Sequence, residues 1–176
     1  ATQIELDRAL EKLIDMLEKK GKLDNTVIAL VGDHYPYTIP VNEINQISSY
    51  ERDDIIEVNR SNFILWNNEM KEVIEVEKVG SQIDVLPTLL NLFGVEYDSR
   101  LIIGKDILSD STEGIAIFSN RSWVTNLGTY ISTTGVFTPK EGAEIEEGYI
   151  NKKNVEVANK FTMSSNFIKY NIYTKF

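Results

Sequence analysis

The sequence contains no cysteine and only one histidine, His34. The absence of cysteine excludes disulfides, thiolate metal sites and a cysteine nucleophile. Because there is one imidazole, any mechanism that needs two histidines has to take the second from elsewhere. No apolar run approaches the roughly 20 residues that a membrane-spanning helix requires, so we do not expect this segment to cross a bilayer.

Basic residues are also scarce relative to acidic ones, 18 against 27, which gives a net charge of −9. Nucleic acid favours the opposite sign of charge and is not expected as a partner. The 176 residues, 42% of them hydrophobic, suffice for one domain with a small appendage. The chain begins with Ala1 and enters a helical pattern almost at once, which favours an internal piece of a longer protein.

The first half of the chain has the pattern of an α/β fold. Apolar residues recur at helical spacing before Gly21: Leu6, Leu10, Leu13 and Leu17. The apolar run 27–31 does not alternate, which is typical of a strand covered on both faces in a parallel sheet. Residues 62–66 predict a second buried strand, and residues 73–79 an edge strand or an extended connection. We therefore expect a mostly parallel sheet with flanking helices.

A helix is predicted near residues 84–93, with Asp84 as its N-cap, because Pro87 then falls in the first turn and Gly94 ends the helix. After about residue 111, short glycine-punctuated segments predict a small antiparallel sheet. Its strand candidates are 115–118, 129–133 and 136–138, with a hairpin turn at Thr134-Gly135. A last helix is predicted over 155–170. We expect two parts: 1–112 in the α/β domain, and 113–176 as an antiparallel subdomain with a helix.

The most informative position is Asp33-His34, which follows Gly32 at the carboxyl end of the apolar strand. Ligand sites in open α/β sheets lie just outside such strand ends. A carboxylate oxygen beside an imidazole nitrogen suits Zn²⁺, Mn²⁺ or a similar ion. The other interpretation makes Asp33 a loop cap and His34 a surface residue, and the residue types alone leave both open.

A catalytic metal site needs three or four protein ligands, so two residues do not complete one. Other carboxylates are available, although each is more often solvated or a helix cap: Glu43, Asp53, Asp54 and Asp84. No hydroxyl has a recognisable base beside it. The chain is therefore predicted to hold part of a site, with the nucleophile outside it.

Four segments, in order and spacing, resemble the alkaline phosphatase and sulfatase superfamily. They are TVIALVGDHYP (26–36), GSQIDVLPTLLNLFG (80–94), LIIGKDILS (101–109) and IFSNRSW (117–123). The first is similar to the superfamily's late metal-binding motif, and the set is most similar to its lipoteichoic acid synthase and phosphoglycerol transferase branch. The resemblance covers roughly residues 3 to 135. It implies part of a sulfatase-like, mostly parallel sheet, followed by a small antiparallel sheet and a helix.

The resemblance further implies that Asp33 and His34 are metal ligands and that Thr38 lies near the substrate, although Pro36-Tyr37 differ from the usual glycine-containing loop. It implies a divalent cation, manganese first, with Mg²⁺, Zn²⁺ and Ca²⁺ as alternatives. The nucleophile (a threonine in this branch), the other acidic ligand and the substrate-binding residues of such enzymes lie upstream of this motif. We therefore expect no catalytic residue in this chain, and no activity from it alone.

The implied function is transfer of phosphoglycerol from a membrane lipid donor to a glycolipid or polymer acceptor. It would take place on the extracellular face of the membrane, in a membrane-anchored protein. One alternative is a sulfatase or phosphodiesterase that hydrolyses its ester, and another is a non-catalytic α/β module. Loss of the upstream half of an α/β domain would expose a sheet edge or an apolar face, so we also expect self-association of this chain.

Overall fold

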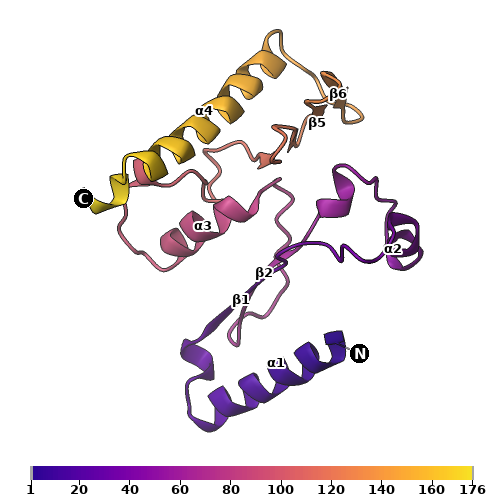
Figure 1. The fold of residues 1–176 in the computed structure, drawn as a ribbon. Helices are drawn as coiled ribbons and strands as arrows, with labels where there is room; N and C mark the ends of the chain where they lie inside the picture. Colours follow the sequence, from indigo (N-terminus) through magenta and orange to yellow (C-terminus); the bar gives the residue numbers. More distant parts are fainter. Residues whose placement is uncertain (1, 176) are drawn as a thin grey trace. The chain divides into compact units, whose positions relative to one another are not determined.

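The computed structural model describes residues 2–175, which form two compact units divided between Ile74 and Glu75. The first unit contains α1 (Thr2–Lys19), β1 (Val27–Val31), α2 (Val41–Ile47) and β2 (Phe63–Asn67) (Figure 1). The second contains α3 (Val85–Leu92), β3 (Ala116–Ile117), β4 (Trp123–Thr125), β5 (Gly128–Ile131), β6 (Val136–Pro139) and α4 (Tyr149–Lys169). The predicted division between residues 112 and 113 falls inside the second unit and stays a prediction.

Short 3-10 turns lie between these elements and after the last helix. They are η1 (Leu23–Asn25), η2 (Glu57–Asn59), η3 (Gln82–Asp84), η4 (Ser99–Leu101) and η5 (Ile172–Thr174). No helix within residues 2–175 combines the length and apolar character needed to span a bilayer.

Helix α1 confirms the pattern predicted from its leucines, and it ends at the predicted glycine. Gly21 has a φ of +60°, a conformation that costs glycine little because it has no Cβ. The next amide, of Lys22, donates to the carbonyl of Leu17 at 2.9 Å and closes the helix. The apolar stripe is not covered within this unit, since Leu6 remains 55% exposed.

The predicted parallel sheet is wrong for the described residues. Strands β1 and β2 lie side by side and pair antiparallel, with Ala29 opposite Leu65 (Figure 1). Val31 and Ile64 are 41% and 49% exposed, so this ribbon is not covered on both faces within its unit. An apolar run signals an apolar environment, but it says nothing about the direction of the neighbouring strand. Residues 73–79, predicted as an edge strand or an extended connection, form no strand, which agrees with the second alternative.

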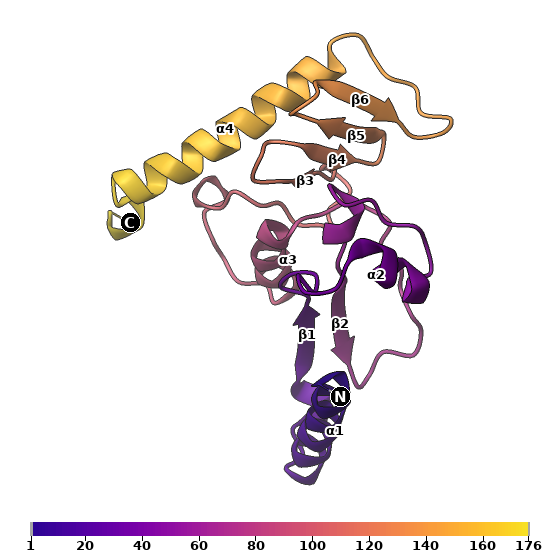
Figure 2. The same cartoon turned by 45° about the vertical axis from the view of Figure 1, so that its right-hand side comes forward.

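The second unit confirms the predicted small antiparallel sheet, with the strand order β3-β4-β5-β6. At the predicted hairpin, the amide of Gly135 donates to the carbonyl of Ile131 at 2.9 Å, and Gly135 has a φ of +70°. Helix α4 runs beside this sheet (Figure 2). Its Tyr149 and Val157 form a buried cluster with Trp123 and Ile115. This cluster is the core of the second unit.

An ion network ties α4 to the loop before β3. Lys153 is only 3% exposed, and its Nζ lies 2.6 Å from Glu113 Oε2 and 3.0 Å from Glu156 Oε2. Burial alone would lower the pKa of Lys153, but the hydrogen bonds to these two carboxylates outweigh it and raise that pKa. Tyr149 donates its hydroxyl to Glu113 at 2.6 Å, and burial together with this bond raises the pKa of Tyr149 to about 12.

Gly104 packs directly on the backbone at the start of α3. A Cβ at this position would lie 1.9 Å from the carbonyl oxygen of Ile83, and backbone cannot yield as a flexible side chain does. Gly104→Ala is therefore expected to lower the free energy of unfolding by about 3 kcal/mol, as measured by urea denaturation followed by circular dichroism.

Gly142→Ala is the matched control, because a Cβ there meets no atom within 4 Å and only the φ of +74° opposes it. It should cost about 1 kcal/mol. Equal losses in the two variants would show that close packing at Gly104 does not matter.

Candidate metal centre

The pairing of Gly32 with the segment before β2 positions the loop after β1. The amide of Gly32 donates to the carbonyl of Asn62 at 3.3 Å and extends the ladder by one residue. A Cβ at position 32 would lie 2.0 Å from Ser61 Oγ and 3.3 Å from Ser61 Cβ, so a larger residue would force the hydroxyl of Ser61 to rotate away. Glycine thus lets the chain leave β1 against the start of β2, with Asp33 and His34 directly after it.

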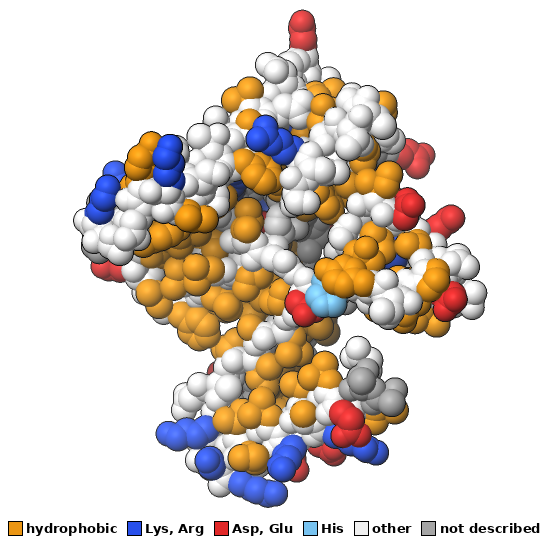
Figure 3. Space-filling view, in the orientation of Figure 1, with side chains coloured by type: hydrophobic (Ala, Val, Ile, Leu, Met, Phe, Trp, Pro, Cys, Tyr) orange, Lys and Arg blue, Asp and Glu red, His pale blue; other side chains and the backbone are white. Residues whose placement is uncertain are grey.

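Asp33 and His34 bring an oxygen and a nitrogen to one place at the surface. The distance between Asp33 Oδ2 and His34 Nε2 is 3.5 Å. The other carboxylate oxygen, Oδ1, accepts the amide of His34 at 2.9 Å and orients the carboxylate. The side chains are 87% and 47% exposed, and the histidine is visible at the surface in pale blue in Figure 3. The pair is therefore accessible to an ion.

The separation of the two atoms fits a shared ion better than a direct hydrogen bond. Hydrogen bonds between nitrogen and oxygen are about 2.7–3.2 Å long, shorter than the 3.5 Å observed here. Two ligand atoms that each lie about 2.1–2.3 Å from one ion are about 3.0–3.8 Å apart, for angles from about 90° in an octahedral site to about 109° in a tetrahedral one. The arrangement can thus accept a small divalent cation without a large movement of either side chain.

The surroundings of His34 leave Nε2 available to a cation. Nδ1 lies 2.7 Å from the carbonyl oxygen of Tyr35, and because a carbonyl only accepts, Nδ1 carries the proton. In the neutral ring the lone pair is then on Nε2, the arrangement by which metal-binding histidines are usually oriented. The ring also stacks on Tyr37 at 4.4 Å between centroids, which restricts its rotation.

Thr38 lies in an exposed turn that follows this aromatic pair. The amide of Ile39 donates to the carbonyl of Pro36 at 3.0 Å and closes the turn. The structure thus places Thr38 on the same loop as Asp33 and His34. Its predicted role beside the substrate stays a prediction.

The other carboxylates considered from the sequence do not join the pair. Asp53 caps the chain after it, since Oδ1 accepts the amides of Ile55 and Ile56 at 2.8 and 2.6 Å. Glu43 and Asp54 are exposed on the same unit. In the part of the chain that the structure describes, no three histidine, aspartate or glutamate side chains are grouped to hold an ion.

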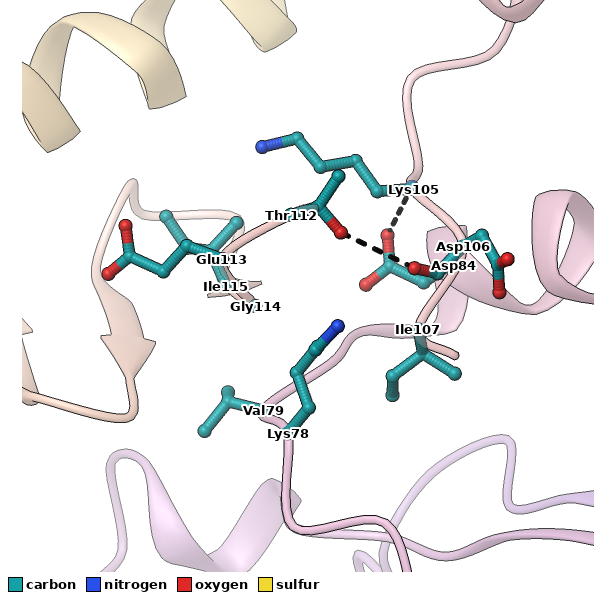
Figure 4. Close-up of a pocket in the computed structure, with 10 residues that line it drawn as sticks. All are labelled: Lys78, Val79, Asp84, Lys105, Asp106, Ile107, Thr112, Glu113, Gly114 and Ile115. Atoms are coloured by element: carbon teal, nitrogen blue, oxygen red, sulfur yellow. Dashed lines mark hydrogen bonds between the residues drawn. The ribbon is translucent and has the colours of Figure 1, made fainter. Parts of the chain in front are cut away.

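Asp84 stands directly before α3, as predicted, but its side chain makes no capping hydrogen bond to that helix and has another structural role. It is 8% exposed, and its two oxygens accept the amides of Ser81 and Lys105, each at 2.8 Å. Figure 4 shows the bond to Lys105. Thr88 supports the same junction, because its hydroxyl accepts the amide of Ile107 at 3.0 Å. The small cavity here, of about 10 Å³, has room for one water at most. Asp84 therefore joins the segments 80–94 and 101–109 and is not a ligand site.

Residues 3–95 match the sulfatase family, and this match covers more than half of the chain. The chain therefore belongs to the sulfatase family. It is 32% identical over 162 residues to the lipoteichoic acid synthase of Staphylococcus aureus, and 31% identical over 152 residues to the lipoteichoic acid synthase-like YvgJ of Bacillus subtilis. The chain is thus related to lipoteichoic acid synthases, as the sequence motifs had indicated.

These alignments cover 86% and 80% of the chain, respectively, but only 24% of each relative. The chain therefore spans about a quarter of the length of the curated relatives it matches. The fold is similar to the crystal structure of the lipoteichoic acid synthase LtaP from Listeria monocytogenes, with a TM-score of 0.72 and 24% identity. That similarity covers 93% of this chain and 43% of the LtaP chain, and it establishes the fold.

Proposed function

We propose that Asp33 and His34 are two ligands of a divalent cation in a sulfatase-family catalytic centre. The observation that carries the proposal is the 3.5 Å separation of Asp33 Oδ2 and His34 Nε2, with the proton of the imidazole held on Nδ1. Two ligands give weak binding, and catalytic sites use three or more. The remaining ligands and the nucleophile would come from a part of the sulfatase domain outside this chain.

Relatives named lipoteichoic acid synthases support phosphoglycerol transfer as the reaction. A membrane lipid would be the donor, a glycolipid or a polymer the acceptor, and the extracellular face of the membrane the place. Mn²⁺ is our preferred ion, and a bound divalent ion lowers the pKa of a coordinated hydroxyl and stabilises negative charge on the transferred group. In this chain, Asp33 and His34 would hold the ion, and Thr38 would contact the substrate from the same loop.

The match to the sulfatase family also supports a second candidate, hydrolysis of a sulfate or phosphate ester with water as the acceptor. Both reactions use the same two ligands. They differ in the fate of the group released from the donor, so product analysis with and without an added acceptor distinguishes them.

The 176-residue chain by itself is expected to turn over no phosphodiester, even with added Mn²⁺, because the nucleophile is outside it. It should nevertheless bind Mn²⁺ weakly, as measured by electron paramagnetic resonance of the free ion. Binding should be lost in Asp33→Asn, which removes the negative charge of one ligand, and in His34→Ala, which removes the other ligand.

Asp54→Asn is the matched control, an exposed carboxylate of the same unit, and should bind Mn²⁺ as the unchanged chain does. Phosphodiester turnover by the isolated chain would mean that the site is complete and that our assignment of the missing parts is wrong. Unchanged Mn²⁺ binding by both ligand variants would overturn the assignment of the ligands.

A further inference from the structure

The distal end of α4 and the turn after it carry positive charge in an otherwise acidic chain. Five lysines but only one acid, Glu156, occur between Tyr149 and Lys175, whereas the whole chain has a net charge of −9. No acidic residue follows Glu156 in the sequence. Lys169 and Lys175, at the far end, are both exposed. The local charge there is opposite to that of the rest of the chain.

Apolar and aromatic side chains are exposed at the same end. Ile168 is 80% exposed, Tyr170 52% and Tyr173 59%. The ammonium of Lys169 lies over the ring of Tyr170, 5.2 Å from its centroid. We call these three residues, together with Lys169 and Lys175, the terminal patch. Figure 3 shows basic and apolar side chains together over this end of α4.

The terminal patch is a folded surface. Asn171 has a φ of +48°, which turns the chain out of α4 and into η5. The hydroxyl of Tyr173 donates to the carbonyl of Leu101 at 3.0 Å, and the ring of Tyr173 meets Phe167 edge-on at 5.4 Å. The exposed side chains are therefore held together on the ordered segment formed by the end of α4 and η5.

We propose that the terminal patch binds the surface of an anionic lipid bilayer. Tyrosine is favoured at the boundary between headgroups and acyl chains, because its ring is apolar and its hydroxyl polar. Ile168 would enter the apolar layer, and the two lysines would meet anionic headgroups. With one aliphatic side chain and two exposed lysines, binding is weak and reversible. The surface is independent of Asp33 and His34 and goes beyond the proposed function.

Other partners fit these residues less well. In a symmetric contact with a second copy, the same lysines would face each other and repel. A soluble polyanion would engage Lys169 and Lys175, but it would leave Ile168 in water. A lipid surface satisfies both the charged and the apolar members of the patch.

The test is co-sedimentation of the 176-residue chain with vesicles of phosphatidylcholine, alone or mixed with an equal part of phosphatidylserine. The headgroup of phosphatidylserine is not glycerol, so these vesicles offer no phosphoglycerol donor to the proposed metal centre. The assay therefore reports on the terminal patch and not on the proposed function. We expect binding to the mixed vesicles only. The double change Lys169→Gln and Lys175→Gln should lower the partition coefficient by about fivefold per lysine. The change Ile168→Ser with Tyr170→Ser should lower it by about tenfold.

The matched control combines Lys152→Gln with Val155→Ser, two exposed residues on α4 outside the patch, and should bind as the unchanged chain does. Equal binding by the control and by the lysine variant would overturn the proposal. Sedimentation of the chain without vesicles, which the expected self-association would cause, is measured in parallel and subtracted. Loss in the lysine variant alone would identify a general polyanion site and would also contradict a lipid-binding surface.

Discussion

Turnover by a protein that carries the complete sulfatase domain is expected to fall about 10³-fold when His34 is replaced by alanine. The reason is the geometry of the pair, in which Nε2 presents its lone pair 3.5 Å from the carboxylate of Asp33. Loss of one ligand weakens the hold on the ion, and with it the stabilisation of charge on the transferred group. Steady-state assays with a lipid donor and saturating Mn²⁺ measure the effect.

Asp33→Asn should have an effect of similar size, because an amide oxygen lacks the negative charge that a divalent cation favours. The metal content of the purified variants, measured by atomic absorption, should fall together with turnover. Asp54→Asn should leave both quantities unchanged. If turnover fell while the metal content stayed at the level of the unchanged protein, His34 would serve the reaction in another way and the ligand assignment would be wrong.

Trp123→Ala is expected to lower the free energy of unfolding by about 4 kcal/mol, the largest stability effect that we predict for this chain. Trp123 is fully buried, its ring stacks on Tyr130 at 5.4 Å, and its Nε1 donates to Asn154 at 2.8 Å. The change removes the centre of the second unit and leaves the amide of Asn154 without its donor. Urea denaturation monitored by circular dichroism gives the value.

Leu108→Ala is the matched control in the same unit, since Leu108 is 44% exposed and its loss leaves no cavity. It should cost less than about 1 kcal/mol. A loss for Trp123→Ala that does not exceed the loss for Leu108→Ala would mean that this cluster does not hold the second unit together.

The sequence predicted elements where local signals were strong. The leucine spacing and Gly21 placed α1. The glycines at 94 and 135 placed the end of α3 and the last hairpin, because both positions have a positive φ, which glycine adopts more easily than other residues. The three-residue strand β4 was not among the predicted strands. Helix α4 begins at Tyr149, six residues before the predicted start, because the helix follows directly from Gly148 in the left-handed conformation.

Features that depend on distant partners were not predictable in the same way. The apolar run of β1 could not reveal that its neighbour β2 runs antiparallel, because strand direction depends on the connection between them. Asp84 looked like a helix cap, but one of its two amide partners, Lys105, is 21 residues further along the chain. Asp33 and His34 were found from a motif, whereas the carbonyl of Tyr35 that sets the tautomer depends on the path of the loop.

The most direct measurement is anomalous scattering at the manganese absorption edge. It uses crystals of a protein with the complete sulfatase domain, grown with Mn²⁺, and locates the cation in relation to the loop after β1. The account predicts a peak within about 2.3 Å of both the Asp33 carboxylate and His34 Nε2. A fully occupied manganese peak coordinated elsewhere, with Nε2 of His34 facing solvent, would contradict it.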